Sequence, residues 1–94
     1  MKISEIQIIP VKPQDGLVAF VSFVLDESIY LGSIAILTRP EGGYRLVYPT
    51  KKVGLRSLNI FHPINKEFAN LIEKEVFVKF EDVMKNDRYD SFNT

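Results

Sequence analysis

The sequence contains no cysteine and only one histidine, His62. Without cysteine the chain cannot form disulfides or thiolate metal sites, and one histidine cannot build a multi-histidine site within one chain. No stretch approaches the roughly 18 consecutive apolar residues that a membrane-spanning helix needs. The opening residues also lack the layout of a secretory signal peptide. We therefore expect no bound metal, no membrane association and a cytoplasmic location.

Paired catalytic groups are also absent from the sequence pattern. No histidine, serine or lysine lies at a catalytic spacing from the acidic residues of the C-terminal third, which include Glu67, Glu73, Glu75 and Glu81. The Gly42-Gly43 pair belongs to a turn signal and not to a loop that cradles phosphate. We expect a protein that is not an enzyme and that uses neither a cofactor nor a small-molecule substrate.

The net charge at neutral pH is zero, but the charges are segregated along the 94 residues. Residues 39–66 carry six basic residues and a single acidic residue, Glu41, whereas acidic residues are in excess on both sides. A local excess of positive charge favours an anionic partner at one face of a neutral protein. Alternatively, these cations only solvate a connection, and the residue pattern leaves both interpretations open.

The first half of the chain is a series of apolar, β-branched runs separated by turn residues. These runs predict strands over residues 2–9, 17–25, 29–38 and 44–48. Turns are expected between them, at residues 10–16, 26–28 and 40–43. Pro10 and Pro13 are expected to end the first strand, and Gly32 suggests a bulge inside the third. Because every connection is too short for a crossover, the pattern predicts an antiparallel meander.

The second half predicts a basic loop over residues 50–57, a fifth strand or edge segment over residues 58–61, and a helix. Apolar residues recur every four positions at Phe68, Ile72, Val76, Phe80 and Met84. This stripe predicts an amphipathic helix from Lys66 to about Met84, with Asn65 as its N-cap. We expect one α+β domain over residues 1–85, with the helix packed on a four- to five-stranded meander. Residues 86–94 are expected to form a polar, frayed tail.

The segment from Tyr48 to Asn65 resembles the signature of a known family. It contains Pro-Thr-Lys-Lys, a short glycine-containing loop, and then Phe61 followed by His-Pro-Ile-Asn. A strand-rich half precedes this segment and one helix follows it. The order is similar to that of SpoVG-like proteins, the stage V sporulation and septation regulators of bacteria. The resemblance covers residues 1–80.

This resemblance implies a small homodimeric regulator that binds DNA and, in some members, RNA. It matches Lys51 and Lys52 to the basic pair of the family and places Arg56 near the downstream basic position, as nucleic-acid-binding residues. The loop departs from the family pattern because it is slightly shorter, lacks the usual Pro-Asp or Pro-Asn, and has Leu58 before Asn59. The alternative function is a protein-interaction module of the same fold that has lost strong nucleic-acid binding.

Other residues leave two roles open. Tyr44 and Tyr48 share one strand face, where they could stack on nucleic-acid bases, although packing in a core or interface is the interpretation we favour. We interpret His62 as a turn residue before Pro63 rather than as a catalytic base or a metal ligand. The meander also leaves an unpaired edge, which predicts pairing with a second copy of the chain.

Overall fold

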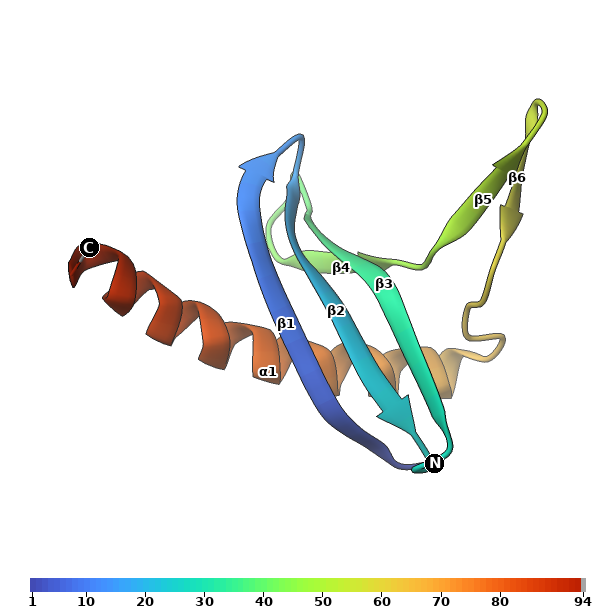
Figure 1. The fold of residues 1–94 in the computed structure, drawn as a ribbon, viewed down its shortest axis with the longest axis horizontal. Helices are drawn as coiled ribbons and strands as arrows, with labels where there is room; N and C mark the ends of the chain where they lie inside the picture. Colours follow the sequence, from blue (N-terminus) through green and yellow to red (C-terminus); the bar gives the residue numbers. More distant parts are fainter. Residues whose placement is uncertain (94) are drawn as a thin grey trace.

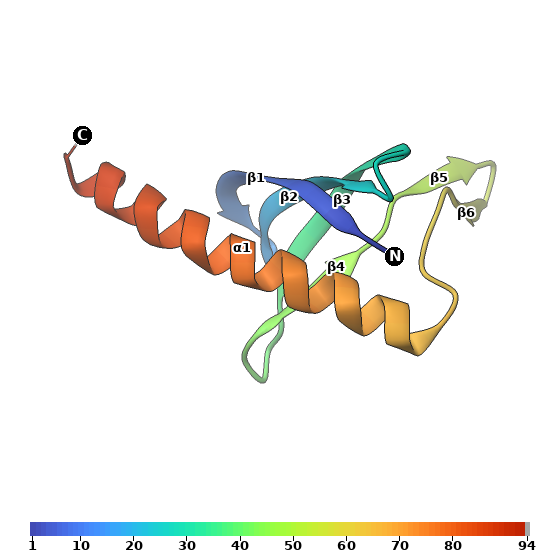
Figure 2. The same ribbon diagram turned by 90° about the horizontal axis from the view of Figure 1, so that it is seen from below.

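The computed structural model describes the backbone of residues 1–93 and the side chains of residues 1–85. Residues 1–93 form six strands and one helix, which are β1 (Ile3–Gln14), β2 (Leu17–Leu25), β3 (Ile29–Thr38), β4 (Tyr44–Val47), β5 (Thr50–Val53), β6 (Arg56–Asn59) and α1 (Lys66–Asn93). β1 to β4 form one antiparallel sheet in sequential order, whereas β5 pairs with β6 in a second sheet. α1 crosses one face of the four-stranded sheet (Figures 1 and 2). The predicted α+β meander with one packed helix is confirmed.

The hydrophobic core lies between the inner face of the central strands and one stripe of α1. Its fully buried members are Ala19, Val21 and Phe23 of β2, Ile34 and Ile36 of β3, and Ile72, Val76 and Phe80 of α1. The four-residue spacing on α1 places its three members on one side of the helix. Phe68 and Met84, at the two ends of the predicted stripe, are only partly buried. The stripe therefore contacts the sheet most closely at its centre.

The predicted end of the first strand at Ile9 is wrong, because β1 continues through both prolines to Gln14. β1 is an edge strand that pairs only with β2. An edge strand tolerates proline where the missing N–H would face away from its neighbour. Pro10 lies opposite Ala19, and the register shifts between Pro10 and Gln14. The prolines therefore mark an edge of the sheet rather than the end of a strand.

The bulge predicted at Gly32 is confirmed. The pairing of β2 with β3 shifts register between Val21 and Phe23, at the part of β3 that contains Gly32 and Ser33. Ser33 adopts a positive φ of 62°. A Cβ atom on Gly32 would lie 3.0 Å from the ring of Tyr30, so a larger residue at position 32 would push this exposed ring slightly away from the strand.

α1 begins at the predicted cap and ends later than predicted. The Oδ1 atom of Asn65 accepts a hydrogen bond of 2.7 Å from the backbone N–H of Phe68, which confirms the N-cap. α1 continues to Asn93, beyond Met84, because no glycine or proline interrupts it. Its C-terminal part extends past the sheet (Figure 1). The side chains of residues 86–94 lie outside the described part, and their frayed character stays a prediction.

Tyr44 and Tyr48 pack inside the domain, as we favoured. The ring of Tyr44 lies edge-on to Phe80 at a centroid distance of 4.9 Å, and it also approaches Phe77 at 6.2 Å. The ring of Tyr48 lies 6.1 Å from that of Phe61, again edge-on. Both tyrosines are partly buried against the core and are not exposed as a platform for nucleic-acid bases.

Tyr48 supplies a test of this packing. Burial, with a smaller effect from the Glu73 carboxylate, raises the pKa of the Tyr48 phenol to about 12. The folded-state pKa lies above the ordinary value of about 10, so the folded protein keeps the neutral phenol to a higher pH than the unfolded chain does. The resulting contribution to the free energy of unfolding is complete below pH ~10 and is lost towards pH ~12. The hydroxyl also has no hydrogen-bond partner among the described residues. We expect Tyr48→Phe to raise the free energy of unfolding at pH 7 by about 1 kcal/mol.

Urea unfolding at pH 7 and at several values between pH 9 and pH 12 measures both effects. Between about pH 9 and pH 12, the free energy of unfolding should fall less for the Tyr48→Phe variant than for the parent protein. Tyr30→Phe is the matched control, because Tyr30 is largely exposed and the substitution should leave both quantities unchanged. A Tyr48→Phe variant that is less stable than the parent at pH 7 would contradict the burial of an unpaired hydroxyl.

Candidate nucleic-acid interface

Residues 50–57, which the sequence predicted to be a loop, belong to a two-stranded hairpin of β5 and β6. Gly54 and Leu55 form its two-residue turn. Gly54 has a φ of 63° and Leu55 does not have a positive φ, which is the pattern of a type II′ turn with glycine first. The strand predicted over residues 58–61 is present with different bounds, because β6 begins at Arg56 and ends at Asn59. A Gly-X pair between two short strands is the sequence signal that would have predicted the hairpin.

The register of the hairpin divides the predicted basic residues between two faces. Lys51 pairs with Leu58, and Val53 pairs with Arg56. Because paired residues and alternate residues share a face, these four side chains lie on one side of the hairpin. Lys52 lies on the other side, together with Thr50, Ser57 and Asn59. The structure therefore brings Lys51 and Arg56 to one face and separates Lys52 from them.

The two faces offer different chemistry. The first face combines two cations with two apolar side chains, of which Val53 is 51% exposed and Leu58 is 44% exposed. The second face combines Lys52 with hydroxyl and amide groups that can donate hydrogen bonds to an anion. The sequence analysis overlooked these polar and apolar neighbours, because only the pairing of the strands places them beside the cations.

The hairpin stands away from the rest of the protein (Figures 1 and 2). Every residue of β5 and β6 is exposed, and the hairpin contains no acidic residue. Among the described side chains the two ion pairs lie elsewhere, between Lys2 and Glu27 at 3.1 Å and between Arg39 and Glu41 at 3.8 Å. The charges of Lys51, Lys52 and Arg56 are thus free to meet an external anion.

The base of the hairpin is attached to the domain by a few contacts. The backbone N–H of Ile60 donates a hydrogen bond of 3.0 Å to the carbonyl of Pro49, which closes the hairpin. Phe61 then packs on Tyr48. The Nδ1 atom of His62 lies 3.1 Å from the carbonyl of Pro63, and since a carbonyl only accepts, this hydrogen bond requires the proton on Nδ1. His62 therefore has a local role in the connection to α1.

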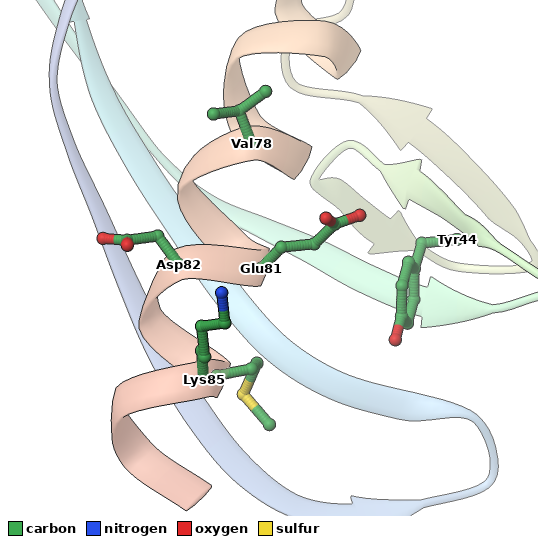
Figure 3. Close-up of a pocket in the computed structure, with 6 residues that line it drawn as sticks. Tyr44, Val78, Glu81, Asp82 and Lys85 are labelled. Atoms are coloured by element: carbon green, nitrogen blue, oxygen red, sulfur yellow. The ribbon is translucent and has the colours of Figure 1, made fainter. Parts of the chain in front are cut away.

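A groove on the helix side of the domain has a different character. It is lined by Tyr44, Val78, Glu81, Asp82, Met84 and Lys85. Glu81 extends towards Tyr44, whereas Asp82 points to the other side of the helix (Figure 3). With two carboxylates and one ammonium group, this groove does not suit an anionic ligand. Within residues 1–85, no three histidine, cysteine or acidic side chains gather where they could hold a metal ion, and no helix in the described part is long and apolar enough to span a membrane.

Comparison with known proteins identifies the family. Residues 1–82 match the SpoVG family model. A protein of Bdellovibrio bacteriovorus that bears the name septation protein SpoVG is 28% identical over 86 residues, which cover 92% of this chain and 79% of the relative. A protein of Phytoplasma australiense with the same name is 26% identical over 87 residues, which cover 92% of this chain and 90% of the relative. Because the family match includes the whole sheet, the hairpin and most of the packed part of α1, this chain belongs to the SpoVG family.

Proposed function

We propose that this protein is a homodimeric, non-enzymatic regulator that binds nucleic acid through the β5–β6 hairpin, with Lys51, Lys52 and Arg56 contacting phosphates. The observation that carries the proposal is a projecting hairpin that presents three cations and no acidic residue. Since the named relatives are septation proteins, we propose septation as the regulated process. We also propose that the protein lies in the cytoplasm, together with the nucleic acid that it binds.

The geometry of the hairpin supports DNA as the main ligand. The major groove of B-form DNA is wide enough to admit a two-stranded β-ribbon, whereas the major groove of double-stranded RNA is deep and narrow. Lysine binds phosphate as a point charge without regard to sequence. Arg56 can in addition form paired hydrogen bonds with a guanine edge, so it is the residue that supplies any base preference. RNA is the second ligand class of the proposal.

An anisotropy titration of the protein with a labelled DNA duplex at increasing salt concentration tests this function. If a dimer neutralises about six phosphates, the logarithm of the binding constant should fall linearly with the logarithm of salt concentration, with a slope near −5. Saturable binding at low salt with such a slope supports the proposal. No binding at about 50 mM salt, or binding that salt does not weaken, would contradict it.

Dimerisation is proposed because the four-stranded sheet has one poorly protected edge. The β1 edge carries Pro10, Pro13 and a register shift near Glu5, which has a φ of 50°. Prolines and bulges discourage pairing with another strand. β4 forms the opposite edge and contains none of these features. We expect a second copy to pair along β4 and to double the number of cations presented to one ligand.

Multi-angle light scattering on the purified protein measures this assembly. We expect a mass twice that of the chain at micromolar concentration. A monomer mass under these conditions would remove the dimer from the proposal, and the titration would then be expected to show a slope near −3, for three cations per complex.

One observation favours the alternative of a protein-interaction module. Val53 and Leu58 expose apolar surface beside the cations, and Ile60 at the base of the hairpin is 60% exposed. Exposed apolar side chains near a rim of charge are common at protein interfaces. A protein that fails to bind nucleic acid in the titration but co-purifies with an acidic partner would fit this alternative.

A further inference from the structure

Leu55 occupies the outermost point of the hairpin. It is the second residue of the two-residue turn, and its side chain is fully exposed. A single exposed leucine is ordinary on a protein surface, so exposure alone implies no function. The position is what distinguishes Leu55, because it forms an apolar tip immediately ahead of Arg56 and in front of the two lysines.

The spacing between this tip and the lysines matches the depth of a DNA groove. Strand residues advance by about 3.3 Å, so Lys52 and Lys51 lie roughly 7 Å and 10 Å behind Gly54 along β5. The grooves of B-form DNA are about 7.5–8.5 Å deep. When the tip reaches the floor of a groove, the two lysines therefore lie near its rim, where the phosphates are.

A second copy of the chain does not fit this tip. A twofold contact between two hairpins would bring the same surface of each copy together. Lys51 and Arg56 of one copy would then face Lys51 and Arg56 of the other, with no acidic residue in either hairpin to offset the repulsion. The segregated positive charge instead complements a polyanion. Duplex DNA is a polyanion that also offers apolar surface between its stacked base pairs, where proteins can insert apolar side chains.

We propose that Leu55 is an apolar wedge that enters a base step of duplex DNA and bends the duplex, while Lys51 and Lys52 hold the flanking phosphates. Proteins that insert apolar side chains between base steps unstack them and kink the helix by tens of degrees. This inference rests on the proposed nucleic-acid binding and assigns a further role to a residue that carries no charge.

The test compares the parent protein with Leu55→Ser on a short duplex that contains TA steps, which unstack most easily. Fluorescence anisotropy measures affinity, and energy transfer between dyes at the two ends of the duplex measures bending. We expect the parent protein to raise the energy transfer, and Leu55→Ser to remove most of this rise and to weaken binding by roughly tenfold. Ile64→Ser is the matched control, because Ile64 is also an exposed apolar residue but lies outside the hairpin. It should leave both readouts unchanged.

The outcomes separate the wedge from the binding function. If Leu55→Ser binds and bends the duplex as the parent protein does, the wedge is overturned while phosphate binding by the basic residues stands. If the parent protein binds without bending the duplex, the wedge is likewise overturned. If the parent protein does not bind the duplex at all, both the wedge and the proposed function fail.

Discussion

Replacing Lys51, Lys52 and Arg56 together by alanine is expected to weaken DNA binding by at least about a hundredfold near physiological salt. Each cation that contacts a phosphate releases condensed counterions, so removing three per chain removes about six such contacts from a dimer. The salt slope should therefore fall from near −5 towards zero. Anisotropy titrations at several salt concentrations give both the affinity and the slope.

The matched control is the substitution of Lys12, Lys74 and Lys79 by alanine. These three side chains are also exposed, and their removal changes the net charge by the same amount, but none lies on the hairpin. We expect the control to retain most of its affinity and its slope. Equal losses in the two triple variants would show that binding depends on overall charge and not on the hairpin. Thermal unfolding should be nearly unchanged in both variants, because surface substitutions of this kind rarely exceed about 0.5 kcal/mol.

The two faces of the hairpin can be tested separately with the same assay. Lys52→Ala removes the cation of one face, and the double substitution of Lys51 and Arg56 removes those of the other. If the hairpin lies in a groove with phosphates on both sides, both variants should weaken binding, with slopes that fall in proportion to the cations removed. If only one face meets the ligand, one variant should retain the affinity of the parent protein.

Phe23→Ala is expected to lower the free energy of unfolding by about 3–5 kcal/mol. Phe23 lies on the inner face of β2 and is 0% exposed, within the cluster formed by β2, β3 and α1. Removing its ring loses the burial of the apolar surface and leaves a cavity that close-packed neighbours fill only in part. A domain of this size is stabilised by only about 5–15 kcal/mol, so the variant should be close to unfolding at 37 °C. Urea or thermal unfolding followed by circular dichroism measures the loss.

Phe20→Ala provides the control on the same strand. Phe20 points to the opposite face of β2 and is 37% exposed, so the same substitution removes less buried surface and opens no enclosed cavity. We expect a loss of about 1 kcal/mol. Similar losses for the two variants would contradict the placement of the core between the sheet and α1, and would indicate that the outer face of the sheet is also covered.

The fold could be predicted from the sequence to the extent that it depends on local periodicity. The four-residue apolar spacing from Phe68 to Met84 predicted a helix and the side on which it packs, because burial selects one face of a regular element. The apolar run from Leu17 to Leu25, interrupted only by Ser22, predicted a strand because of its length and its residue types. Turn chemistry located the bends at Asp15-Gly16 and at residues 26–28, where Asp15, Asp26 and Glu27 adopt positive φ.

Predictions that depended on strand neighbours were less successful. Pro10 and Pro13 were expected to end a strand, but whether a proline is tolerated depends on which side of the strand has a partner. The basic segment was predicted to be a loop, because its charged residues interrupt the apolar pattern by which the short strands β5 and β6 could be recognised. Strand pairing involves residues from separate segments, and no single segment specifies its partner or its register.

The sequence by itself determined the family signature, the location of the helix, the strands of the meander and the concentration of positive charge between Arg39 and Lys66. These features are local, because each depends on residue type and spacing within one segment. Only the tertiary structure decided that Lys51 and Arg56 share a face that Lys52 does not, and that Leu55 forms the tip ahead of them. The physical reason is the register of β5 against β6, since a shift of one residue in one strand would place Arg56 on the face of Lys52 instead of the face of Lys51.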